Sequence, residues 1–249
     1  MIKFFLHDSH QAYMLCLVFA EAALELIPQK LWTHPSVMRS AERIGKPPRE
    51  ILLDRSYHHR AMLTLTNHMR RGRPDIVHLS LLSALDSPLN SEALLQIFVH
   101  TCNNQIIYVN PVTRLPKNYD RFKGLIEQLF LHGKVPKKSP SLMHLENGNL
   151  SSIIRHVKPK AIIAFSKFGR YVAPHHQYKD FILNDVLLVV VGAFPRGPLS
   201  APLLNLATDV ISIDKDSLTA WTVTSRLIYD YERIFKITQR RHALSRLTE

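Results

Sequence analysis

The stretch VLLVVVGAFPRGPLSAPLLNLATDVISIDKDSLTAWTV, residues 186–223, decides the fold. It opens with an aliphatic run at 186–191, which is too short to span a bilayer and has the length of a buried strand. Gly192 ends this run, Gly197 follows, and a second β-rich run occupies 210–213. A strand that ends in a glycine-bearing loop is where α/β proteins commonly hold a small molecule, because backbone can approach the ligand where no Cβ intervenes. Taken alone, however, the pattern is explained better by a buried strand with an ordinary loop.

The spacing of the glycines excludes two common nucleotide-binding motifs. The loop does not read G-x-G-x-x-G, and Gly197 is followed by Pro198 and Leu199 instead of Lys and Ser or Thr. A dinucleotide fingerprint and a P-loop are therefore both disfavoured.

Composition indicates a globular protein with a polyanionic partner. The chain has 249 residues, 46% of them hydrophobic, which is enough for one large domain or two small ones. Lys and Arg number 32 against 20 Asp and Glu, giving a formal net charge of +12. A globular protein this basic usually meets nucleic acid or another anionic surface. The alternative, a basic protein with no such partner, is disfavoured.

The cysteine content and the chain ends suggest a cytoplasmic protein. Cys16 and Cys102 are the only cysteines, which argues against a disulfide framework and fits a reducing compartment. No run is long enough for a transmembrane helix, and charged or histidine side chains at 7, 8 and 10 come too early for a signal peptide. We expect residues 1–13 to be an N-terminal extension, either dispensable or the product of a start upstream of Met14. Residues 14–237 form one domain in this interpretation, followed by a basic tail at 238–249.

Periodicity predicts the remaining elements. Strands are expected at 15–19, 51–53, 76–79, 94–100, 105–109 and 161–165, and helical spacing at 20–27, at 122–130 and at 217–237. A further helix is expected to start within 33–36 and to stop at Gly45. The loop at 134–140 is the best internal boundary, and the basic tail should fray.

An arginine-rich loop precedes the expected strand at 76–79. Arg70, Arg71 and Arg73 flank a glycine, and Pro74 and Asp75 follow. Arginine forks bind phosphate in a bidentate manner, but a solvated basic turn explains the loop equally well. Asp75 either orients Arg73 or simply begins the strand.

A second basic segment, 110–122, alternates basic residues with prolines and aromatics. The prolines stiffen the loop, and Tyr119 and Phe122 could stack on an unpaired base. For Phe122 the alternative is favoured, namely that it begins the core face of the following helix, which leaves the basic residues free for RNA.

The adjacent residues His58 and His59 raise the question of a metal site. No Cys or third His lies at ligand spacing nearby, and adjacent side chains on a helix do not share a face. We therefore expect no metal here and interpret the histidines as solvated or hydrogen-bonded.

Six separated motifs carry a family resemblance. They are VFAEAALELIP (18–28), LLDRSYHHRAM (52–62), RRGRPDIVH (70–78), LDSPLN (85–90), NPVTRLPKNYDRFKGLIEQL (110–129) and VVGAFPRG (190–197). Together they resemble the compact archaeal form of the SPOUT-class methyltransferases that modify N1 of a pseudouridine in small-subunit ribosomal RNA. The resemblance covers residues 14–237.

The resemblance implies a fold, a cofactor and partners. The fold would be an α/β SPOUT-like sheet with helices on both faces and a C-terminal trefoil knot, a rare exception to unknotted topology. Members are homodimers, act on small-subunit ribosomal RNA in ribosome biogenesis, and bind S-adenosylmethionine in the knot loops. The matching cofactor positions are Phe165, Ser166, Gly192, Gly197, Pro198, Leu199, Ile213, Asp214, Lys215, Asp216, Ser217 and Leu218. The RNA-contacting positions fall on Arg73, Arg114, Lys117 and Arg121, with Asp75 steadying Arg73.

The chemistry assigns catalytic roles to Arg73 and Asp75. The base must be flipped out and its N1 aligned with the methyl group, and an arginine can stabilise negative charge developing on the base carbonyls. Asp75 would hold Arg73 or accept the proton, and we favour holding because a carboxylate paired with an arginine is a weak base. The competing interpretation is a ribosome-assembly RNA-binding protein whose role does not depend on catalysis.

Overall fold

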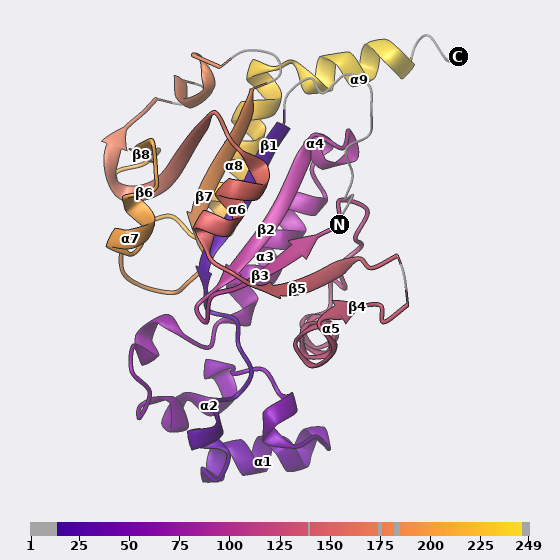
Figure 1. Ribbon diagram of the computed structural model, residues 1–249, viewed down its shortest axis with the longest axis vertical. Coiled ribbons are helices and arrows are strands. Elements are labelled where there is room, and N and C mark those ends of the chain that lie inside the picture. Colours follow the sequence, from indigo (N-terminus) through magenta and orange to yellow (C-terminus); the bar gives the residue numbers. More distant parts are fainter. Residues whose placement is uncertain (1–13, 139, 174–175, 182–184, 246–249) are drawn as a thin grey trace.

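The computed structural model describes residues 14–138, 140–173, 176–181 and 185–245, so the predicted extension at 1–13 lies outside the described residues. The described chain forms an eight-stranded mixed sheet in the order β4-β5-β3-β2-β1-β7-β6-β8 (Figure 1). The strands are β1 Met14–Ala22, β2 Leu95–Thr101, β3 Gln105–Val109, β4 Lys134–Val135, β5 Met143–Asn147, β6 Ala161–Tyr171, β7 Val186–Gly192 and β8 Asp209–Ser212. The strands β2, β1, β7, β6 and β8 run parallel to one another. At the other edge β3 pairs antiparallel with β2, β5 with β3, and β4 with β5.

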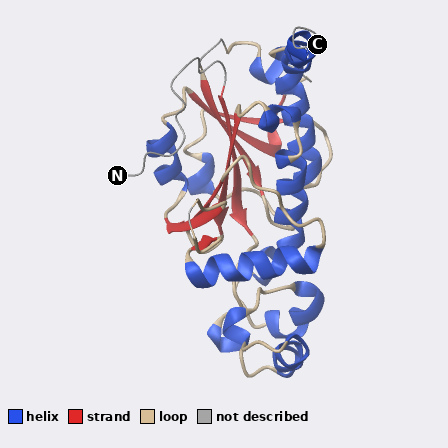
Figure 2. Ribbon diagram, turned by 90° about the vertical axis from the view of Figure 1, so that its right-hand side faces the viewer, coloured by secondary structure: helices blue, strands red, loops and turns tan. Residues whose placement is uncertain are grey.

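Helices cover both faces of the sheet, as the sequence predicted (Figure 2). They are α1 Pro35–Ile44, α2 Arg55–Met62, α3 Pro74–Leu85, α4 Pro88–Ser91, α5 Tyr119–His132, α6 Leu150–Val157, α7 Ala201–Leu204, α8 Ala220–Ile234 and α9 Ile237–Ser245. Helices α3, α5 and α8 contribute to the larger core, and α6 and α7 to a second core. None of the described helices is both long and apolar enough to cross a membrane.

The predicted central strands are correct because they are buried on both sides. In β1 and β7 alternate side chains enter opposite cores, Leu15, Leu17, Phe19, Leu187, Val189 and Val191 on the α3 and α8 side and Cys16, Val18, Ala20, Leu188 and Val190 on the α6 side. A parallel strand covered on both faces reads as a continuous apolar run, which is how 186–191 reads. Register joins Leu17 to Val189 and Phe19 to Val191. The mixed α/β sheet is therefore as expected, while the trefoil knot stays a prediction.

Several predicted elements are wrong. Residues 76–79 are not a strand but part of α3, which begins with Pro74 at its first turn and Asp75 beside the helix dipole. A short apolar run fits a strand and a buried helix equally well. The helix start signals at Pro74 and Asp75 favour the helix that the structure shows. Strand β1 continues to Ala22 where helical spacing was expected, and 51–53 makes only an isolated bridge between Leu52 and Leu26.

A small helical lobe with its own core lies below the sheet in Figure 1. Its buried side chains come mainly from α1, α2 and the turns around them: Ile27, Leu31, Val37, Ala41, Ile51, Leu53, Ala61, Met62 and Leu65. Glu127 of α5 joins the lobe to the sheet, accepting from Leu52 N at 3.1 Å and from Lys46 Nζ at 2.6 Å. We therefore propose that residues 14–237 fold as a single domain.

Two expected boundaries are also different. Lys134 and Val135 lie in β4 and pair with His144 and Met143, so this segment is part of the sheet. The basic tail does not fray from its start, because α9 continues to Ser245 and Arg241 Nε lies 3.1 Å from Glu92 Oε1.

Candidate functional site

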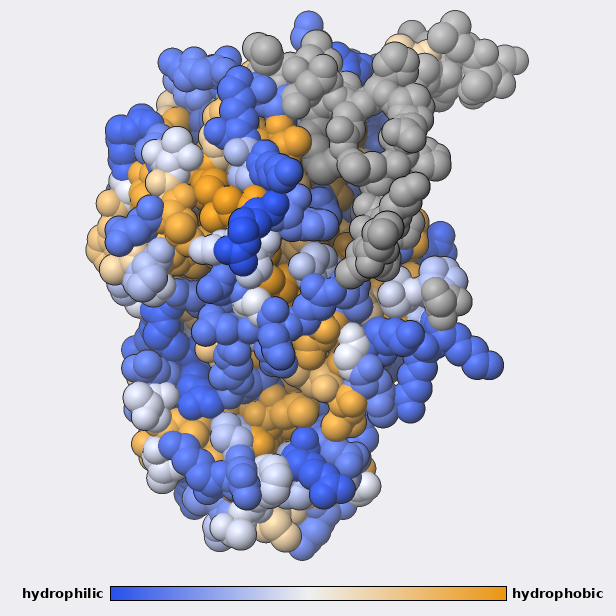
Figure 3. Space-filling model, viewed as in Figure 1, coloured by the Kyte–Doolittle hydropathy of each residue, from blue (hydrophilic) through white to orange (hydrophobic). Residues whose placement is uncertain are grey.

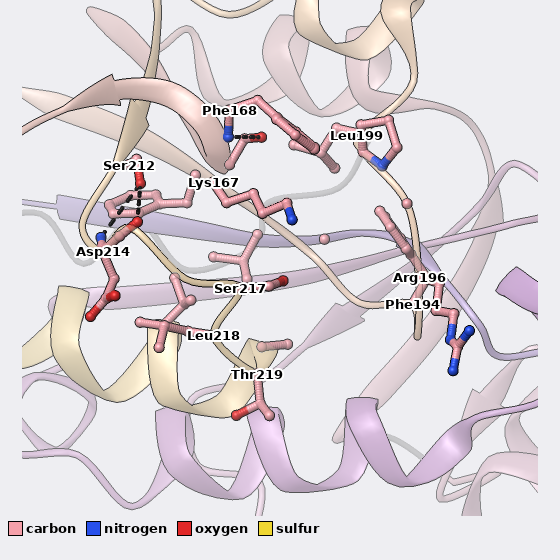
Figure 4. A pocket seen from close by; sticks show the side chains of 18 of the residues that line it. Lys167, Phe168, Phe194, Arg196, Leu199, Ser212, Asp214, Ser217, Leu218 and Thr219 are labelled. Carbon is pink, nitrogen blue, oxygen red and sulfur yellow. Dashed lines mark hydrogen bonds between the residues drawn. The ribbon is translucent and has the colours of Figure 1, made fainter.

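A cleft of about 610 Å³ opens at the carboxyl ends of β7 and β8, beside the register break in the middle of β6 (Figure 4). The three strands are neighbours and parallel, and Phe165 of β6 pairs with Val191 of β7 and Ile211 of β8, so the loops after β7 and β8 meet beside β6 at one edge of the sheet. The volume lies within the ~300–1,000 Å³ typical of small-molecule sites. The cleft is lined from four segments, Arg73 and Ile76; 165–168; 191–192 with 194–199; and 211–214 with 216–221 and Val223.

The first wall of the cleft comes from β6. Phe165 is buried, and the pairing of β6 with β8 breaks its register directly after it. Ser166 Oγ then accepts from Phe168 N at 3.3 Å, which turns the backbone at the cleft. The side chains of Lys167 and Phe168 also line it, and Figure 4 shows Lys167 extending between the walls.

The second wall is the glycine loop after β7. The predicted cofactor positions Gly192, Gly197, Pro198 and Leu199 all line the cleft. Leu199 is buried and supplies apolar surface, whereas the loop tip at 196–198 is exposed. Gly197 has a φ of 94°, a backbone conformation that side chains with a Cβ rarely adopt.

The third wall is the turn after β8. Ser212 Oγ donates to Asp214 O at 2.6 Å, and Asp214 Oδ1 accepts from Asp216 N at 3.0 Å. The hydrogen bond from Asp216 N, followed by the pairing with Arg226, lowers the pKa of Asp214. Ile213, Asp214, Asp216, Ser217 and Leu218 line the cleft as predicted, whereas Lys215 is exposed and does not.

Arg73 and Asp75 lie together at the edge of the same cleft. Arg73 Nε donates to Asp75 Oδ1 at 2.8 Å and Nη2 donates to Oδ2 at 2.7 Å, so the pair is bidentate. The hydrogen bond to Asp75 raises the pKa of the Arg73 guanidinium, partly offset by burial. Both Asp75 oxygens accept from the guanidinium, which is the arrangement expected of a residue that holds Arg73 in place.

The other predicted RNA-contacting residues lie outside the cleft. Arg114, Lys117 and Arg121 are exposed, on the loop before α5 and on its first turn. His78 Nε2 lies 2.8 Å from Pro116 O, which fastens this loop to α3, the helix that begins beside Arg73. The basic loop and the cleft are thus connected through one helix.

The two aromatic side chains of this segment are engaged in the fold. Phe122 is fully buried and its ring stacks on His78 with centroids 4.2 Å apart, which confirms the interpretation as a core residue. Tyr119 donates its hydroxyl to Asp54 Oδ2 at 2.8 Å, and burial raises its pKa. Tyr119 therefore joins α5 to the helical lobe through its hydrogen bond to Asp54.

The two neighbouring histidines have different environments. His58 is buried and its Nδ1 accepts from Asp54 N at 3.0 Å, and burial lowers its pKa to about 4. His59 is exposed. Within the described ranges, no cluster of three or more His, Cys, Asp or Glu side chains has the arrangement of a metal site.

Sequence reasoning missed several side chains at or beside the cleft besides Lys167 and Phe168. Phe194, Thr219 and Trp221 line it, and Arg70 contacts the glycine loop from the preceding turn. Trp221 falls within the helical spacing expected at 217–237, and it packs against the core as well as lining the cleft. Arg70 was noticed as one of three arginines, but nothing in its spacing distinguishes it from Arg71.

The comparisons agree on one family. The model for the EMG1/NEP1 methyltransferase family matches residues 17–232. The ribosomal RNA small subunit methyltransferase Nep1 of Staphylothermus marinus is 41% identical over 222 residues, which are 89% of this chain and 96% of that protein. Its counterpart from Thermococcus sibiricus is 44% identical over 221 residues, covering 88% and 98%. The crystal structure of Archaeoglobus fulgidus Nep1 bound to S-adenosylhomocysteine superposes with a TM-score of 0.79 at 39% identity, covering 90% and 99% of the two chains.

Proposed function

The chain belongs to the EMG1/NEP1 methyltransferase family, and from this premise we propose that it methylates N1 of a pseudouridine in small-subunit ribosomal RNA. Family membership makes it an S-adenosylmethionine-dependent methyltransferase of small-subunit ribosomal RNA. The pseudouridine target, the residue roles, the homodimer and the cytoplasmic location are parts of the proposal. The observation that carries it is the meeting of the loops after β7 and β8 with the middle of β6 in one cleft, which Arg73, paired with Asp75, also lines.

The cleft fits the proposed cofactor. Leu199, Ile213 and Leu218 offer apolar surface for a flat ring, and the glycine loop exposes backbone polar groups. The carboxylates of Asp214 and Asp216 stand at the cleft and suit hydroxyl or cationic groups. S-adenosylmethionine, when bound, supplies a methyl group made electrophilic by its sulfonium.

Arg73 is proposed to stabilise charge on the target base. Pseudouridine is C-linked, so its N1 carries a proton. When this proton leaves to solvent ahead of methyl transfer, negative charge develops on the base carbonyls, and the bond between N1 and the methyl carbon would then form as the methyl–sulfur bond breaks. A guanidinium already fixed by Asp75 can meet that charge without reorganising. The base has to leave its stack to reach the cleft, and the exposed residues Arg114, Lys117 and Arg121 would hold the flanking backbone.

Cofactor titration tests the enzyme interpretation against the binding-only one. We expect calorimetry to find one S-adenosylmethionine site per chain. An assembly protein that has lost catalysis would bind the RNA with no saturable cofactor site, and that result would overturn the proposal.

We expect Lys117→Ala to weaken binding to all RNAs alike. Lys117 is exposed and outside the cleft, so its loss removes a phosphate contact and should reduce the salt slope of binding by about one. The measurement is RNA titration at several salt concentrations. Arg155→Ala is the matched control, because it removes the same charge from α6 on the opposite face of the sheet. Equal slopes for Lys117→Ala and the unmodified protein would remove Lys117 from the RNA surface.

We expect light scattering to give a dimer at micromolar concentration. The helix α8 offers little apolar surface for the dimer interface around Trp221 and Leu227, since Leu227 is fully buried inside its own subunit and Trp221 lines the cleft. Phe168 and Tyr171 of β6 are instead 70% and 64% exposed, and Figure 3 shows hydrophobic surface over this part of the molecule. Exposed aromatic surface of this kind favours a symmetric interface.

Tyr171→Glu should shift the protein toward monomer. Val112→Glu is its control, because Val112 is equally exposed, at 71%, but lies on the loop before α5. A monomeric unmodified protein would refute the dimer, and a dimer insensitive to Tyr171→Glu would move the interface elsewhere.

A further inference from the structure

The glycine loop is fastened by a side chain from a distant part of the chain. Arg70 lies in the turn His68–Arg70 that leads toward α3. Its Nη1 donates to Pro198 O at 2.7 Å and lies 3.4 Å from Arg196 O. Its guanidinium carbon also lies 3.6 Å from the centroid of the Phe194 ring. One side chain thus contacts the loop at three positions, two of them backbone carbonyls.

Glu21 completes this attachment from the end of β1. Its Oε2 accepts from Arg70 Nη2 at 2.6 Å, and both carboxylate oxygens lie 3.3 Å from Ser200 N. Glu21 has a φ of 51°, an uncommon backbone conformation for a residue other than glycine. The loop is therefore held at 196 and 198 by the arginine and at 200 by its carboxylate partner.

The segment that carries Arg70 also carries the proposed catalytic arginine. Arg73 follows three residues later, and its backbone N donates to Ala23 O at 3.1 Å, just beyond β1. Gly72 O between them accepts from Arg55 N at 2.8 Å, at the start of α2. A shift of the loop that moves Arg70 must therefore also disturb the short, hydrogen-bonded segment that presents Arg73.

We infer that Arg70 and Glu21 are positioning residues that couple cofactor binding to RNA binding. Order imposed on the glycine loop by the cofactor is passed through Arg70 to the segment bearing Arg73, and RNA held by Arg73 orders the loop in return. Linkage requires both ligands to raise each other's affinity by the same factor. This inference rests on the proposed function, since it takes the cleft as the cofactor site and Arg73 as an RNA contact.

The test measures affinities in both directions for Arg70→Met, which keeps an unbranched side chain but removes the donors. Calorimetry gives the affinity for S-adenosylmethionine with and without a saturating RNA hairpin that contains pseudouridine, and RNA titration gives the reverse. We expect the unmodified protein to show coupling of at least about fivefold. Arg70→Met should bind the cofactor about tenfold more weakly, and its coupling should fall to about one.

Arg71→Met is the matched control from the next position. Arg71 forms an equally close pair with Glu25, at 2.6 and 2.5 Å, but makes it away from the glycine loop. This pair is the more buried one, with side chains 19% and 2% exposed against 29% and 17% for Arg70 and Glu21. Arg71→Met should therefore lower the melting temperature more than Arg70→Met while keeping the coupling. If the role of Arg70 were only structural, the variant with the larger drop in melting temperature, Arg71→Met, would also show the larger loss of coupling.

Glu21→Gln gives a second variant with an isosteric side chain that retains an acceptor for Ser200 N. It should lose coupling as Arg70→Met does, and the double variant should be less than additive. Coupling as strong as in the unmodified protein in both Glu21→Gln and Arg70→Met would overturn the inference. So would a loss of coupling in Arg71→Met as large as the loss in Arg70→Met. An unmodified protein that binds no S-adenosylmethionine would instead overturn the proposed function, and one that binds and methylates without any coupling would overturn this inference alone.

Discussion

The Arg73→Ala enzyme should lose about 2–4 kcal/mol of transition-state stabilisation, a drop of about 30- to 900-fold in the single-turnover rate. The reason is geometric, because Arg73 lines the cleft and its guanidinium is fixed by two hydrogen bonds to Asp75. A fixed donor stabilises charge without reorganising, so the loss should persist at saturating RNA and saturating cofactor.

Companion variants separate catalysis from RNA binding. Asp75→Ala should resemble a milder Arg73→Ala, because it leaves the guanidinium in place but unheld, and the double variant should be less than additive. Arg73→Lys keeps the charge but not the planar fork, so its single-turnover rate should lie between those of the unmodified enzyme and Arg73→Ala. Arg121→Ala is the control, since Arg121 is exposed outside the cleft and should lose affinity alone. If Arg73→Ala kept its saturated rate and lost only RNA affinity, Arg73 would be one more phosphate contact.

The second large effect is expected for Gly197→Val, which should weaken S-adenosylmethionine binding at least tenfold, or about 1.4 kcal/mol. A branched side chain is strained at a φ of 94°, and the Cβ alone would lie 2.9 Å from Arg70 Nη1. The substitution should therefore displace both the loop and the arginine that holds it. Calorimetry on the folded variant measures the affinity directly.

Gly45→Val controls for backbone strain. Gly45 ends α1 with a φ of 72° and has nothing within 4 Å of the position of a Cβ, so the strain is similar but remote from the cleft. It should lower the melting temperature and leave cofactor affinity unchanged. Unchanged affinity in folded Gly197→Val would remove this loop from the cofactor site.

The parts of the site that are local in sequence were predictable. Gly192 and Gly197 follow the apolar run at 186–191, and the composition of this run requires burial on both faces. Asp75 is close enough to Arg73 in the sequence for a bidentate pair. The resemblance supplied the remaining cofactor positions, and of these only Lys215 lies outside the cleft.

The parts that depend on chain topology were not predictable from spacing. The loops after β7 and β8 meet beside residues 165–168 only because β6 lies between β7 and β8, an order that periodicity does not contain. Arg70 reaches Glu21 and Pro198 across 49 and 128 residues, so no local pattern marks it. The prediction of a strand at 76–79 is wrong because a run of three apolar residues and a histidine fits a strand and a buried helix equally well.

The most direct test of the central claim is methyl transfer to two RNA hairpins that differ only in carrying pseudouridine or uridine at one position. The RNA is incubated with protein and S-adenosylmethionine, digested, and its nucleosides are compared by mass spectrometry with N1-methylpseudouridine. The account predicts one methyl group per hairpin, on N1, in the pseudouridine RNA and none in the uridine RNA. Equal methylation of both hairpins, or methylation of neither by protein that binds the cofactor, would contradict it.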